Sequence, residues 1–395
     1  SNGLEKRPKL RFPGFDEPYK PCHIGDIYTE RSQRGASDME LLSVTMNDGV
    51  KPRSEIEGKD NSSEDKSNYK IVRKGDMVYN SMRMWQGANG ISPCDGIVSP
   101  AYTVLMPKQE INNGYFAALF KSVKLINEFR KNSQGMTSDT WNLKYPQIET
   151  IKVQIPSVSE QDKVSELFSV LDERIATQAQ LVESLKKYKR GVVRTLLSPK
   201  HCKLKNVEWT TAKIGDIGTF IKGAPLSKAD ISSDGTPFIL YGELYTTYNE
   251  VISKVVRKTQ ASVDKQYYSQ IGDVIIPTSG ETPEEISTAS CVMLPDIILA
   301  GDLNIYRCTQ VDGRIMSYIL NHVVNDRIAR VAQGKSIVHV QATEISKIEI
   351  TYPDLISQKK LIETFDAITA RIDQSMRELE LLQVHRKALL QELFI

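Results

Sequence analysis

The amino-acid sequence predicts an α+β fold in which two similar mixed α/β domains are each followed by a long helix. Three observations indicate this fold class: one stretch of sequence occurs twice, several elements recur in the same order at an offset near 200 residues, and both copies end in a heptad pattern of apolar residues. The length of 395 residues agrees, because a single hydrophobic core stops growing well before that size.

The duplicated stretch is SVSEQDKVSELFSVLDERI at 157–175 and DLISQKKLIETFDAITARI at 354–372, aligned without a gap at an offset of 197 residues. Such self-similarity indicates a repeated structural unit. The identical positions are Gln161/Gln358, Lys163/Lys360, Glu166/Glu363, Phe168/Phe365, Arg174/Arg371 and Ile175/Ile372.

Other elements correspond in the same order. A Gly-Asp pair before a β-branched or aromatic run predicts a turn that leads into a strand. Such pairs occur in HIGDIYTE (23–30) and KIGDIGTF (213–220), and in KGDMVYN (74–80) and IGDVIIP (271–277). Two helix-like segments start at Gly114 and Gly313 and run into Gln-Gly pairs. Apolar residues then match at Ile148/Ile345, Ile151/Ile348 and Val153/Ile350.

The two terminal segments of the repeat share a heptad seam that is apolar at most positions, with polar exceptions at corresponding places. Such a narrow seam favours pairing of the two helices, although two separate core helices remain the alternative. The seam fits parallel and antiparallel pairing, and antiparallel pairing would place Gln178 opposite Ser375 and fix the register. The residues expected to pair are Val164, Phe168, Leu171, Ile175, Gln178, Leu185, Leu361, Phe365, Ile368, Ile372, Ser375 and Leu382.

Helix-start signals set the expected boundaries. Ser157 and Glu160 predict a capping box at the first helix, and Asp354 is the expected N-cap of the second. We expect an N-terminal segment, a domain, a helix, a polar linker, a second domain and a second helix, at residues 1–20, 21–156, 157–199, 200–208, 209–353 and 354–395.

Composition predicts a cytoplasmic protein. The net charge of +2 means that any nucleic-acid surface must be a local patch. The five cysteines are scattered without a C-x-x-C pair, which fits a reducing compartment. The start SNGLEKRPKL is polar, and no apolar run approaches 18 residues, so we expect neither a signal peptide nor a membrane span.

Motifs for chemistry are missing. The sequence has no Asp-Pro-Pro or Asn-Pro-Pro aromatic motif for methyl transfer to an amino group and no G-x-G-x-x-G loop. ARVAQGKS (329–336) lacks the first glycine of a phosphate-binding loop and follows a helix-like segment. The histidines and cysteines show no metal-ligand spacing. We therefore expect no catalytic residue, no metal and no cofactor of the chain's own.

The quoted words resemble one family, the specificity subunits of type I restriction-modification systems. The most diagnostic are IPSVSEQDKVSELFSVLDERI with LKKYKRGVVRTLLS, and TYPDLISQKKLIETFDAITARID with RKALLQELF. GTFIKGAPLSKADISSDGTPFILYGEL, GDVIIPTSGETPEEI and ERSQRGASDMELLSVTMNDGVKPRSE are also similar to words of the family's recognition domains. The resemblance covers almost the whole chain after residue 20. Ser357 departs from it, because the family and Glu160 have glutamate at that position.

This resemblance implies a non-catalytic subunit with two target recognition domains, related by a pseudo-twofold axis, that read the two halves of a split double-stranded DNA sequence. The helices would pair antiparallel as a coiled-coil spacer and dock two methyltransferase subunits, which supply the S-adenosylmethionine chemistry. Restriction subunits would complete the complex. A protein-binding scaffold without DNA readout is the alternative function, and a self-sufficient methyltransferase is a third hypothesis.

DNA-reading residues are expected on loops, where arginine and lysine suit guanine and asparagine and glutamine suit adenine. In the first domain the candidates are Arg83, Trp85 and Gln86 in NSMRMWQGANG, Lys131, Gln134, Thr137, Ser138 and Asn142 in KNSQGMTSDTWN, and Arg31, Arg34, Lys51 and Arg53 as phosphate holders. In the second they are Lys222, Ser227, Lys228, Tyr241, Glu243, Ser279, Glu281, Thr282, Gln333, Lys335, Ser336 and His339.

Each candidate also has a purely structural interpretation. Trp85 could belong to the core, and the polar residues beside glycines could satisfy turns. Arg31 and Lys51 could be solvated surface residues. His339, between two valines, could be a buried strand residue.

Overall fold

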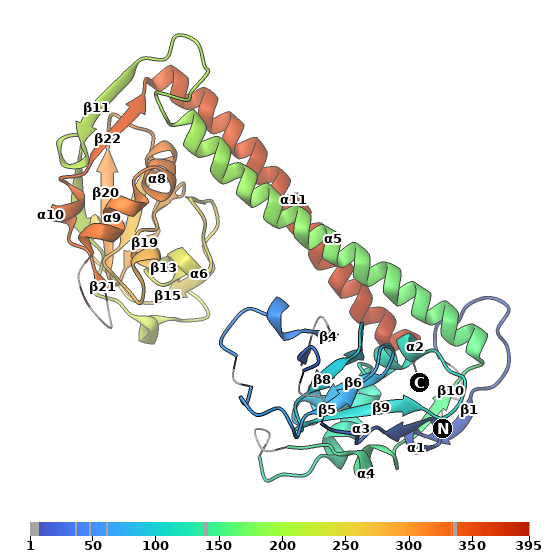
Figure 1. Cartoon of the computed structure of the whole chain (residues 1–395). Coiled ribbons are helices and arrows are strands. Elements are labelled where there is room, and N and C mark those ends of the chain that lie inside the picture. The colour runs from blue at the N-terminus through green and yellow to red at the C-terminus, as the bar shows by residue number, and fades with distance from the viewer. Residues whose placement is uncertain are drawn as a thin grey trace. The chain divides into compact units, whose positions relative to one another are not determined.

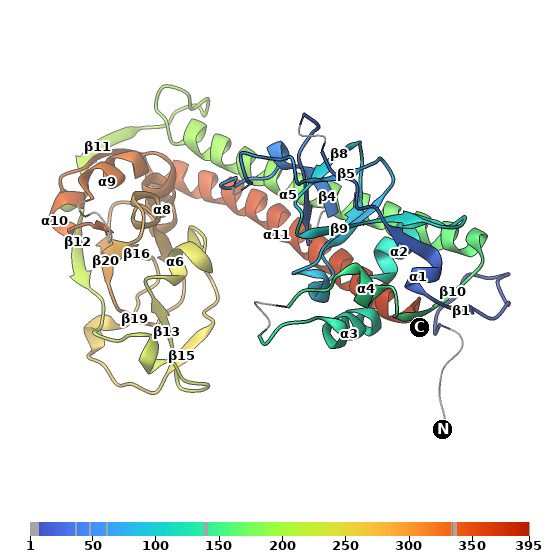
Figure 2. The same ribbon diagram turned by 60° about the horizontal axis from the view of Figure 1, so that its bottom comes forward.

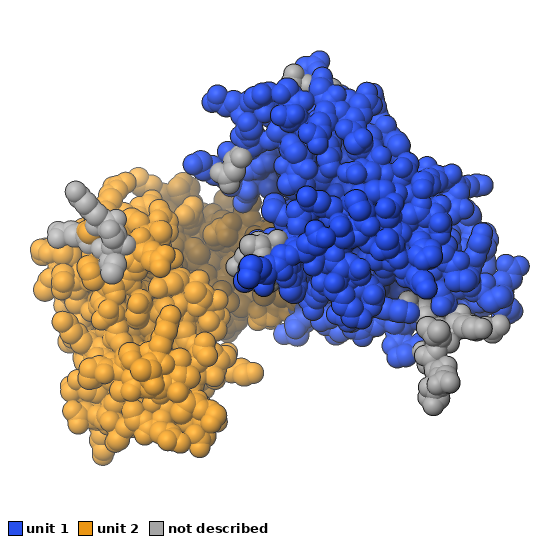
Figure 3. Space-filling model, turned by 90° about the horizontal axis from the view of Figure 1, so that it is seen from below, with its two compact units in different colours: residues 1–180, 377–395 blue, residues 181–376 orange. Residues whose placement is uncertain are grey.

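The computed structural model describes residues 8–35, 38–46, 49–60, 62–137, 141–332, 334 and 338–394. Contacts divide the chain into two compact units, residues 1–180 with 377–395 and residues 181–376 (Figure 3). The division cuts through both long helices, so each unit holds one mixed domain and one end of each long helix.

The first unit begins with a mixed domain and continues into the first long helix (Figure 1). Its elements are β1 (Lys20–His23), α1 (Ile24–Ile27), β2 (Tyr28–Glu30), β3 (Leu42–Thr45), β4 (Gly49–Pro52), β5 (Lys70–Val72), β6 (Met77–Asn80), β7 (Asn89–Ile91), β8 (Gly96–Val98), β9 (Tyr102–Pro107), α2 (Asn113–Leu119), α3 (Val123–Asn132), α4 (Tyr145–Ile148), β10 (Lys152–Ile155) and α5 (Val158–Leu196).

The second mixed domain repeats this plan and is followed by the second long helix, whose end belongs to the first unit. Its elements are β11 (Trp209–Lys213), β12 (Gly218–Lys222), β13 (Thr236–Leu240), α6 (Glu243–Thr246), β14 (Val251–Ile252), β15 (Arg257–Thr259), β16 (Asp273–Pro277), β17 (Ser279–Gly280), α7 (Pro283–Ile286), β18 (Ser290–Val292), β19 (Ile298–Ala300), β20 (Leu303–Cys308), α8 (Gly313–His322), α9 (Asn325–Val331), β21 (Val338–His339), α10 (Ala342–Ile345), β22 (Glu349–Pro353) and α11 (Leu355–Glu392).

The main sheets of the two units have the same strand order. In the first unit it is β2-β9-β6-β7, and in the second it is β12-β20-β16-β18 with β14 added at the edge. Each domain is also closed by an antiparallel pair of its first and last strands, β1 with β10 and β11 with β22. In the second unit α8 packs against β16 and β18, and α8 and β16 are labelled in Figure 2. The predicted fold class of two similar mixed domains with long helices is confirmed.

Of the predicted Gly-Asp pairs, the first of each half lies in a short helical segment, α1 or η3 (Ile214–Asp216), and the second of each half forms a left-handed turn. Gly75 and Gly272 have φ values of +91° and +94°, a left-handed conformation that glycine adopts without strain. The aspartates that follow, Asp76 and Asp273, accept hydrogen bonds from backbone N–H groups three residues earlier at 2.8 and 2.9 Å. The strands β6 and β16 then begin at Met77 and Asp273.

The two helix-like segments are each broken into two helices, which corrects the prediction of one continuous helix per half. In the first unit α2 ends at Leu119, and Ser122 starts α3 because its hydroxyl accepts a hydrogen bond from the N–H of Leu125. Ser122 therefore caps a second helix. In the second unit α8 ends at His322 and α9 begins at Asn325.

The long helices pack against each other within each unit, and in both units the start of one lies beside the end of the other. In the first unit Phe168 of α5 stacks on Phe394, just beyond α11, at 5.8 Å between ring centroids. Arg386 of α11 pairs with Asp172 of α5, with 3.0 Å between Nη2 and Oδ2. In the second unit one buried cluster contains Val193 and Phe365. Each contact set is antiparallel (Figure 1).

The residues expected in the helix seam are buried or half-buried. The buried members are Val164, Phe168, Leu361, Phe365, Ile372 and Ser375, and the half-buried members are Leu171, Ile175, Gln178, Leu185, Ile368 and Leu382. In the part of the chain that the structure describes, no helix is long and apolar enough to cross a membrane.

The helix starts only partly follow the prediction. Asp354 caps α11 as expected, since its Oδ1 accepts hydrogen bonds from the N–H groups of Ile356 and Ser357 at 3.0 Å. These bonds lower the pKa of Asp354 to about 2, the largest cause being the N–H of Ser357. The expected capping box at Ser157 is wrong, because the carboxylate of Glu160 binds Arg11 and Tyr19 instead.

Candidate functional site

Two loops chosen from the sequence meet in the first unit. They are residues 81–88 after β6 and the described residues of 133–143 after α3, and we call them the first loop pair. The N–H of Leu143 donates to the carbonyl of Ser81 at 2.8 Å and joins the loops. The second loop is closed at its base, because Gln134 and Asn142 exchange backbone hydrogen bonds of 3.0 and 2.8 Å.

Two tryptophans hold the first loop pair together. Trp85 and Trp141 meet edge to face, with 5.2 Å between ring centroids and 82° between ring planes. Arg130 of α3 lies over the Trp85 ring at 5.6 Å. Both indoles are half-buried and neither belongs to a hydrophobic core cluster of this unit, so Trp85 is not a core residue.

The remaining candidates of the first loop pair differ in accessibility. Lys131 is exposed and pairs with Glu128 at 2.7 Å. Ser138 lies outside the described residues. Exposed candidates are Arg83, Gln134 and Thr137, and half-buried ones are Gln86 and Asn142.

Arg31 and Arg53, which are expected phosphate holders, bind other groups of the fold. Arg31 binds the turn carboxylate Asp76 with 2.7 and 3.2 Å contacts, and Arg307 binds the equivalent Asp273 in the second unit. Arg53 donates to the carbonyls of Ile56, Gly58 and Lys59 and thereby shapes its own loop. Arg34 is exposed and Lys51 is half-buried. Arg34 is thus the most accessible of the four.

The second unit brings the corresponding loops together. They are residues 278–289 after β16 and the described residues of 332–341 after α9, and we call them the second loop pair. The N–H of Val340 donates to the carbonyl of Thr278 at 3.0 Å, which is the bond that Leu143 and Ser81 make in the first unit. Here a short ladder also joins the loops, with Ser279 opposite His339.

A third loop of the second unit contacts the second loop pair. The turn Gly301–Leu303 before β20 contacts the KGAPLSK loop through Gly223 N to Leu303 O at 2.9 Å. Asp302 of that turn accepts a hydrogen bond from the Ser279 hydroxyl at 2.7 Å. Sequence reasoning did not select Asp302, and no motif marks it.

Several candidate DNA-binding residues of the second unit stabilise the local fold. Ser227 and Thr282 cap short helical turns with their hydroxyls. Glu243 is 7% exposed and binds Arg257 and the N–H of Leu240, so its carboxylate already has partners within the fold.

The other candidates of the second unit remain accessible or are not described. His339 is exposed, which corrects the expectation of a buried strand residue, although it does lie in β21. Gln333, Lys335 and Ser336 lie outside the described residues. Lys222, Lys228 and Glu281 are exposed and Tyr241 is half-buried.

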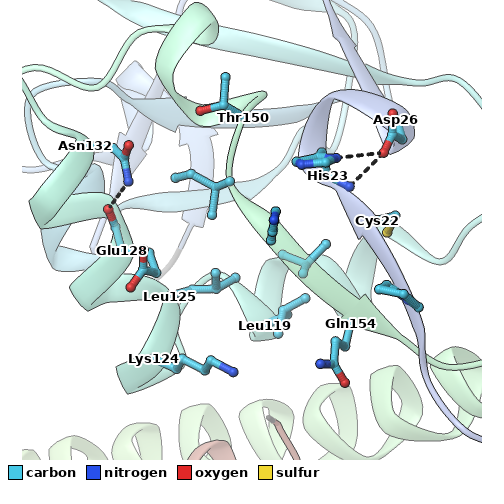
Figure 4. Close-up of a pocket in the computed structure, with 14 residues that line it drawn as sticks. Cys22, His23, Asp26, Leu119, Lys124, Leu125, Glu128, Asn132, Thr150 and Gln154 are labelled. Atoms are coloured by element: carbon cyan, nitrogen blue, oxygen red, sulfur yellow. Dashed lines mark hydrogen bonds and ion pairs between the residues drawn. The ribbon is translucent and has the colours of Figure 1, made fainter. Parts of the chain in front are cut away.

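A groove of about 740 Å³ lies between α3 and the β1-β10 strands of the first unit (Figure 4). Leu119, Leu125 and Val153 line it, and Lys124 and Glu128 are among its polar residues. None of the predicted readers lines this groove. No group of three or more histidine, cysteine, aspartate or glutamate side chains suited to a metal occurs among the described residues.

A family profile described as the type I restriction modification DNA specificity domain matches residues 18–187 and 206–383. The type I restriction enzyme MjaVIII specificity subunit of Methanocaldococcus jannaschii is 22% identical over 347 residues, which are 81% of this chain and 78% of that protein. The putative MjaX specificity subunit of the same organism is 22% identical over 301 residues, covering 72% and 67%.

Two solved structures share the fold. A chain of a type I restriction-modification system, from a study of its assembly and conformational transition, has a TM-score of 0.62 at 13% identity, covering 98% of this chain and 99% of that one. The S subunit of such a system from M. genitalium has a TM-score of 0.57 at 15% identity, with the same coverages.

The fold and the loops define a tandem-domain protein with one equivalent loop site in each domain. The two profile matches extend over most of the chain, one in each half. The chain belongs to the type I restriction modification DNA specificity family and is a specificity subunit with two copies of its domain.

Proposed function

We propose that this chain is the non-catalytic DNA-reading subunit of a type I restriction-modification complex and reads a bipartite sequence in double-stranded DNA. One observation carries the proposal. Each unit places two loops from the same points of the same fold against each other, but the loops carry different side chains in the two units. A duplicated reader with different contact residues suits two different half-sites.

The chemistry of the loops supports base recognition. The first loop pair carries an exposed arginine, Arg83, and its second loop carries the amides Gln134 and Asn142. Arginine pairs with the guanine edge and amides pair with the adenine edge of the major groove. The second unit offers Lys222, Lys228 and the carboxylate of Glu281, which can accept a hydrogen bond from cytosine N4.

The antiparallel helix pair serves as the spacer between the two recognition domains and docks two methyltransferase subunits, which supply the S-adenosylmethionine chemistry. Restriction subunits join through the assembled complex, which acts in the cytoplasm. The recognition domains span residues 21–156 and 209–353, and the spacer helices span 157–199 and 354–395.

The test is protection of DNA by the chain assembled with its two methyltransferase subunits. Hydroxyl-radical footprinting on a duplex that carries the host's bipartite methylation motif should show two short protected tracts with an unprotected gap. A motif-free duplex of equal length is the control and should show neither tract. Equal protection of both duplexes would overturn the proposal in favour of a protein scaffold, and methyl transfer by the purified chain alone would overturn its non-catalytic part.

A further inference from the structure

We propose that Trp141 and Arg130 are positioning residues for one half-site, because they fix Trp85 and the loop that carries Arg83. The proposal rests on the function proposed above. It adds two residues that contact the reading loop and are not themselves expected to touch a base.

The contacts join three segments of the first unit. Trp85 lies in the 3₁₀ turn Met84–Gln86, and its Nε1 donates to the carbonyl of Met82 at 3.0 Å. Trp141 comes from the second loop and meets Trp85 edge to face at 5.2 Å. Arg130 comes from α3 and covers the Trp85 ring at 5.6 Å. Aromatic pairs and cation–π contacts are directional, so together they restrain the position of the indole.

This cluster lies outside the hydrophobic cores of the unit. The cores are built around residues such as Phe116 and Val104, and neither tryptophan belongs to them. The two indoles are half-buried and Arg130 is exposed. Truncation of Trp141 therefore opens no core cavity, and its main consequence falls on the order of the loops.

The restraint acts on Arg83. Arg83 lies immediately before the turn that contains Trp85. Its backbone makes hydrogen bonds of 2.9 Å with the backbones of Asn80 and Gln86. Its side chain is exposed, and within the described residues the structure records no hydrogen bond or ion pair from the guanidinium. Bidentate pairing with guanine requires a fixed backbone, since a small displacement removes one of the two hydrogen bonds.

The second unit has a backbone ladder between its loops where the first unit has the tryptophan pair. There the backbone ladder sets Ser279 opposite His339 and Gly280 opposite Val338. At the repeat offset of 197 residues, Val338 takes the place of Trp141. Both loop pairs share one main-chain hydrogen bond, to which the first adds the side-chain contacts of Trp85 and Trp141 and the second adds the ladder. A substitution at Trp141 should consequently impair one half-site alone.

The experiment uses the chain assembled with its methyltransferase subunits and three duplexes: the host's methylation motif, the motif altered in one half and the motif altered in the other. Trp141→Ala, Arg130→Ala and Arg83→Ala are compared with the conservative Trp141→Phe and Arg130→Lys by competition binding. Arg83→Ala identifies the half-site that the first unit reads. We expect Trp141→Ala to reduce discrimination at that half-site about tenfold or more and to preserve it at the other. Trp141→Phe should restore most of it.

Three results would overturn the inference: unchanged discrimination in Trp141→Ala and Arg130→Ala, equal loss at both half-sites, or loss at the half-site that Arg83→Ala leaves intact. Arg130→Ala keeps both tryptophans, so it tests the idea even where Trp141→Ala fails to fold. Trp209→Phe, in β11, is the matched aromatic control and should leave discrimination unchanged. A wild-type complex that discriminates at neither half-site would overturn the proposed function itself. This result is distinct from the three above, which overturn only the positioning role of Trp141 and Arg130.

Discussion

Gln161 and Gln358 make the same two hydrogen bonds in the two halves of the molecule. Each side chain is 1% exposed and lies in the first turn of a long helix. Each donates to the carbonyl of the proline before its helix and accepts from the backbone N–H of the residue that caps the first helix after the main sheet. The pairs are Gln161 with Pro156 and Asn112 at 3.1 and 3.0 Å, and Gln358 with Pro353 and Asp312 at 2.8 and 2.8 Å.

These bonds tie each long helix to its own domain, and their removal should weaken the junction. Gln161→Ala leaves a buried N–H and a buried C=O without partners, so we expect the free energy of unfolding to fall by about 1–3 kcal/mol. Chemical denaturation of the purified chain measures it, and Gln358→Ala should act similarly in the second unit. The control is Lys163→Ala, another identity of the repeat but exposed, which should change stability by less than about 0.5 kcal/mol. Equal effects of the two substitutions would contradict the argument.

A second junction depends on a buried ion pair. Arg11 binds Glu160 through Nε at 2.8 Å and Nη2 at 2.7 Å, and the two side chains are 13% and 1% exposed. Arg11→Met leaves the Glu160 carboxylate buried without its cation, so we expect a loss of about 3–5 kcal/mol in unfolding free energy. Arg11→Met/Glu160→Met should recover most of that loss, because no buried charge remains.

The exposed ion pair of Lys186 and Glu183 on α5 is the control for the Arg11 and Glu160 variants. Lys186→Met should cost less than about 1 kcal/mol, since an exposed ion pair gains little in water. A double variant as unstable as Arg11→Met alone would show that packing of the N-terminal segment, and not its charge, holds the junction.

Much of the fold was predictable because the sequence contains the same structural unit twice. Phe168 and Phe365 are buried in corresponding places, and Gly75 and Gly272 have the same left-handed backbone. Periodicity over long helices is a strong local signal. The break between α2 and α3 was missed because Ser122 acts through a local cap that interrupts an otherwise regular apolar pattern.

The candidate site was only partly predictable, because partners distant in the sequence decide what a polar residue does. The sequence alone shows no partner for Arg31. In the fold Arg31 binds Asp76, which lies 45 residues further along the sequence. The sequence predicts that Glu160 belongs to a capping box, but in the fold its carboxylate binds Arg11. The choice of loops was better founded, since glycine and polar clusters mark turns by composition. Trp141 was within the chosen segment, and its contact with Trp85 depended on the tertiary fold.

A third prediction concerns acid stability of the second unit. Glu250 accepts a hydrogen bond from Lys189 of α5 at 2.8 Å and pairs with His322 of α8 at 2.7 Å. Burial alone raises the pKa of this carboxyl, but the hydrogen bonds and charges of His322 and Lys189 outweigh burial and lower it to about 2. The folded pKa is below the ordinary value of 4.5, so the stabilisation is complete above pH 4.5 and is lost as pH falls toward 2.

The size of this loss follows from the shift. The lowered pKa corresponds to about 3 kcal/mol, so unfolding free energies measured with urea should begin to fall near pH 5 and continue to fall toward pH 2. Glu250→Gln should flatten that part of the pH dependence. Glu344→Gln, which removes an exposed partner of Lys347, should not. An unchanged slope in Glu250→Gln would assign the acid sensitivity to other carboxylates.

The last prediction tests the spacer as a ruler. Deleting one heptad from each long helix, centred on Gln178 and on Ser375, keeps the seam in phase because seven residues restore the same helix face. Seven residues span about 10 Å of helix, the length of about three base pairs. We expect the unread gap to shorten by about three base pairs while both half-site sequences stay the same.

Sequencing of methylated DNA from cells that carry the shortened chain and its methyltransferase subunits would measure this directly. Deletion of a heptad from α5 alone is the control, because mismatched helices lose their common register and should abolish methylation. A new half-site sequence would mean that the helices shape the recognition domains, and an unchanged gap would mean that the distance between half-sites is set elsewhere in the complex.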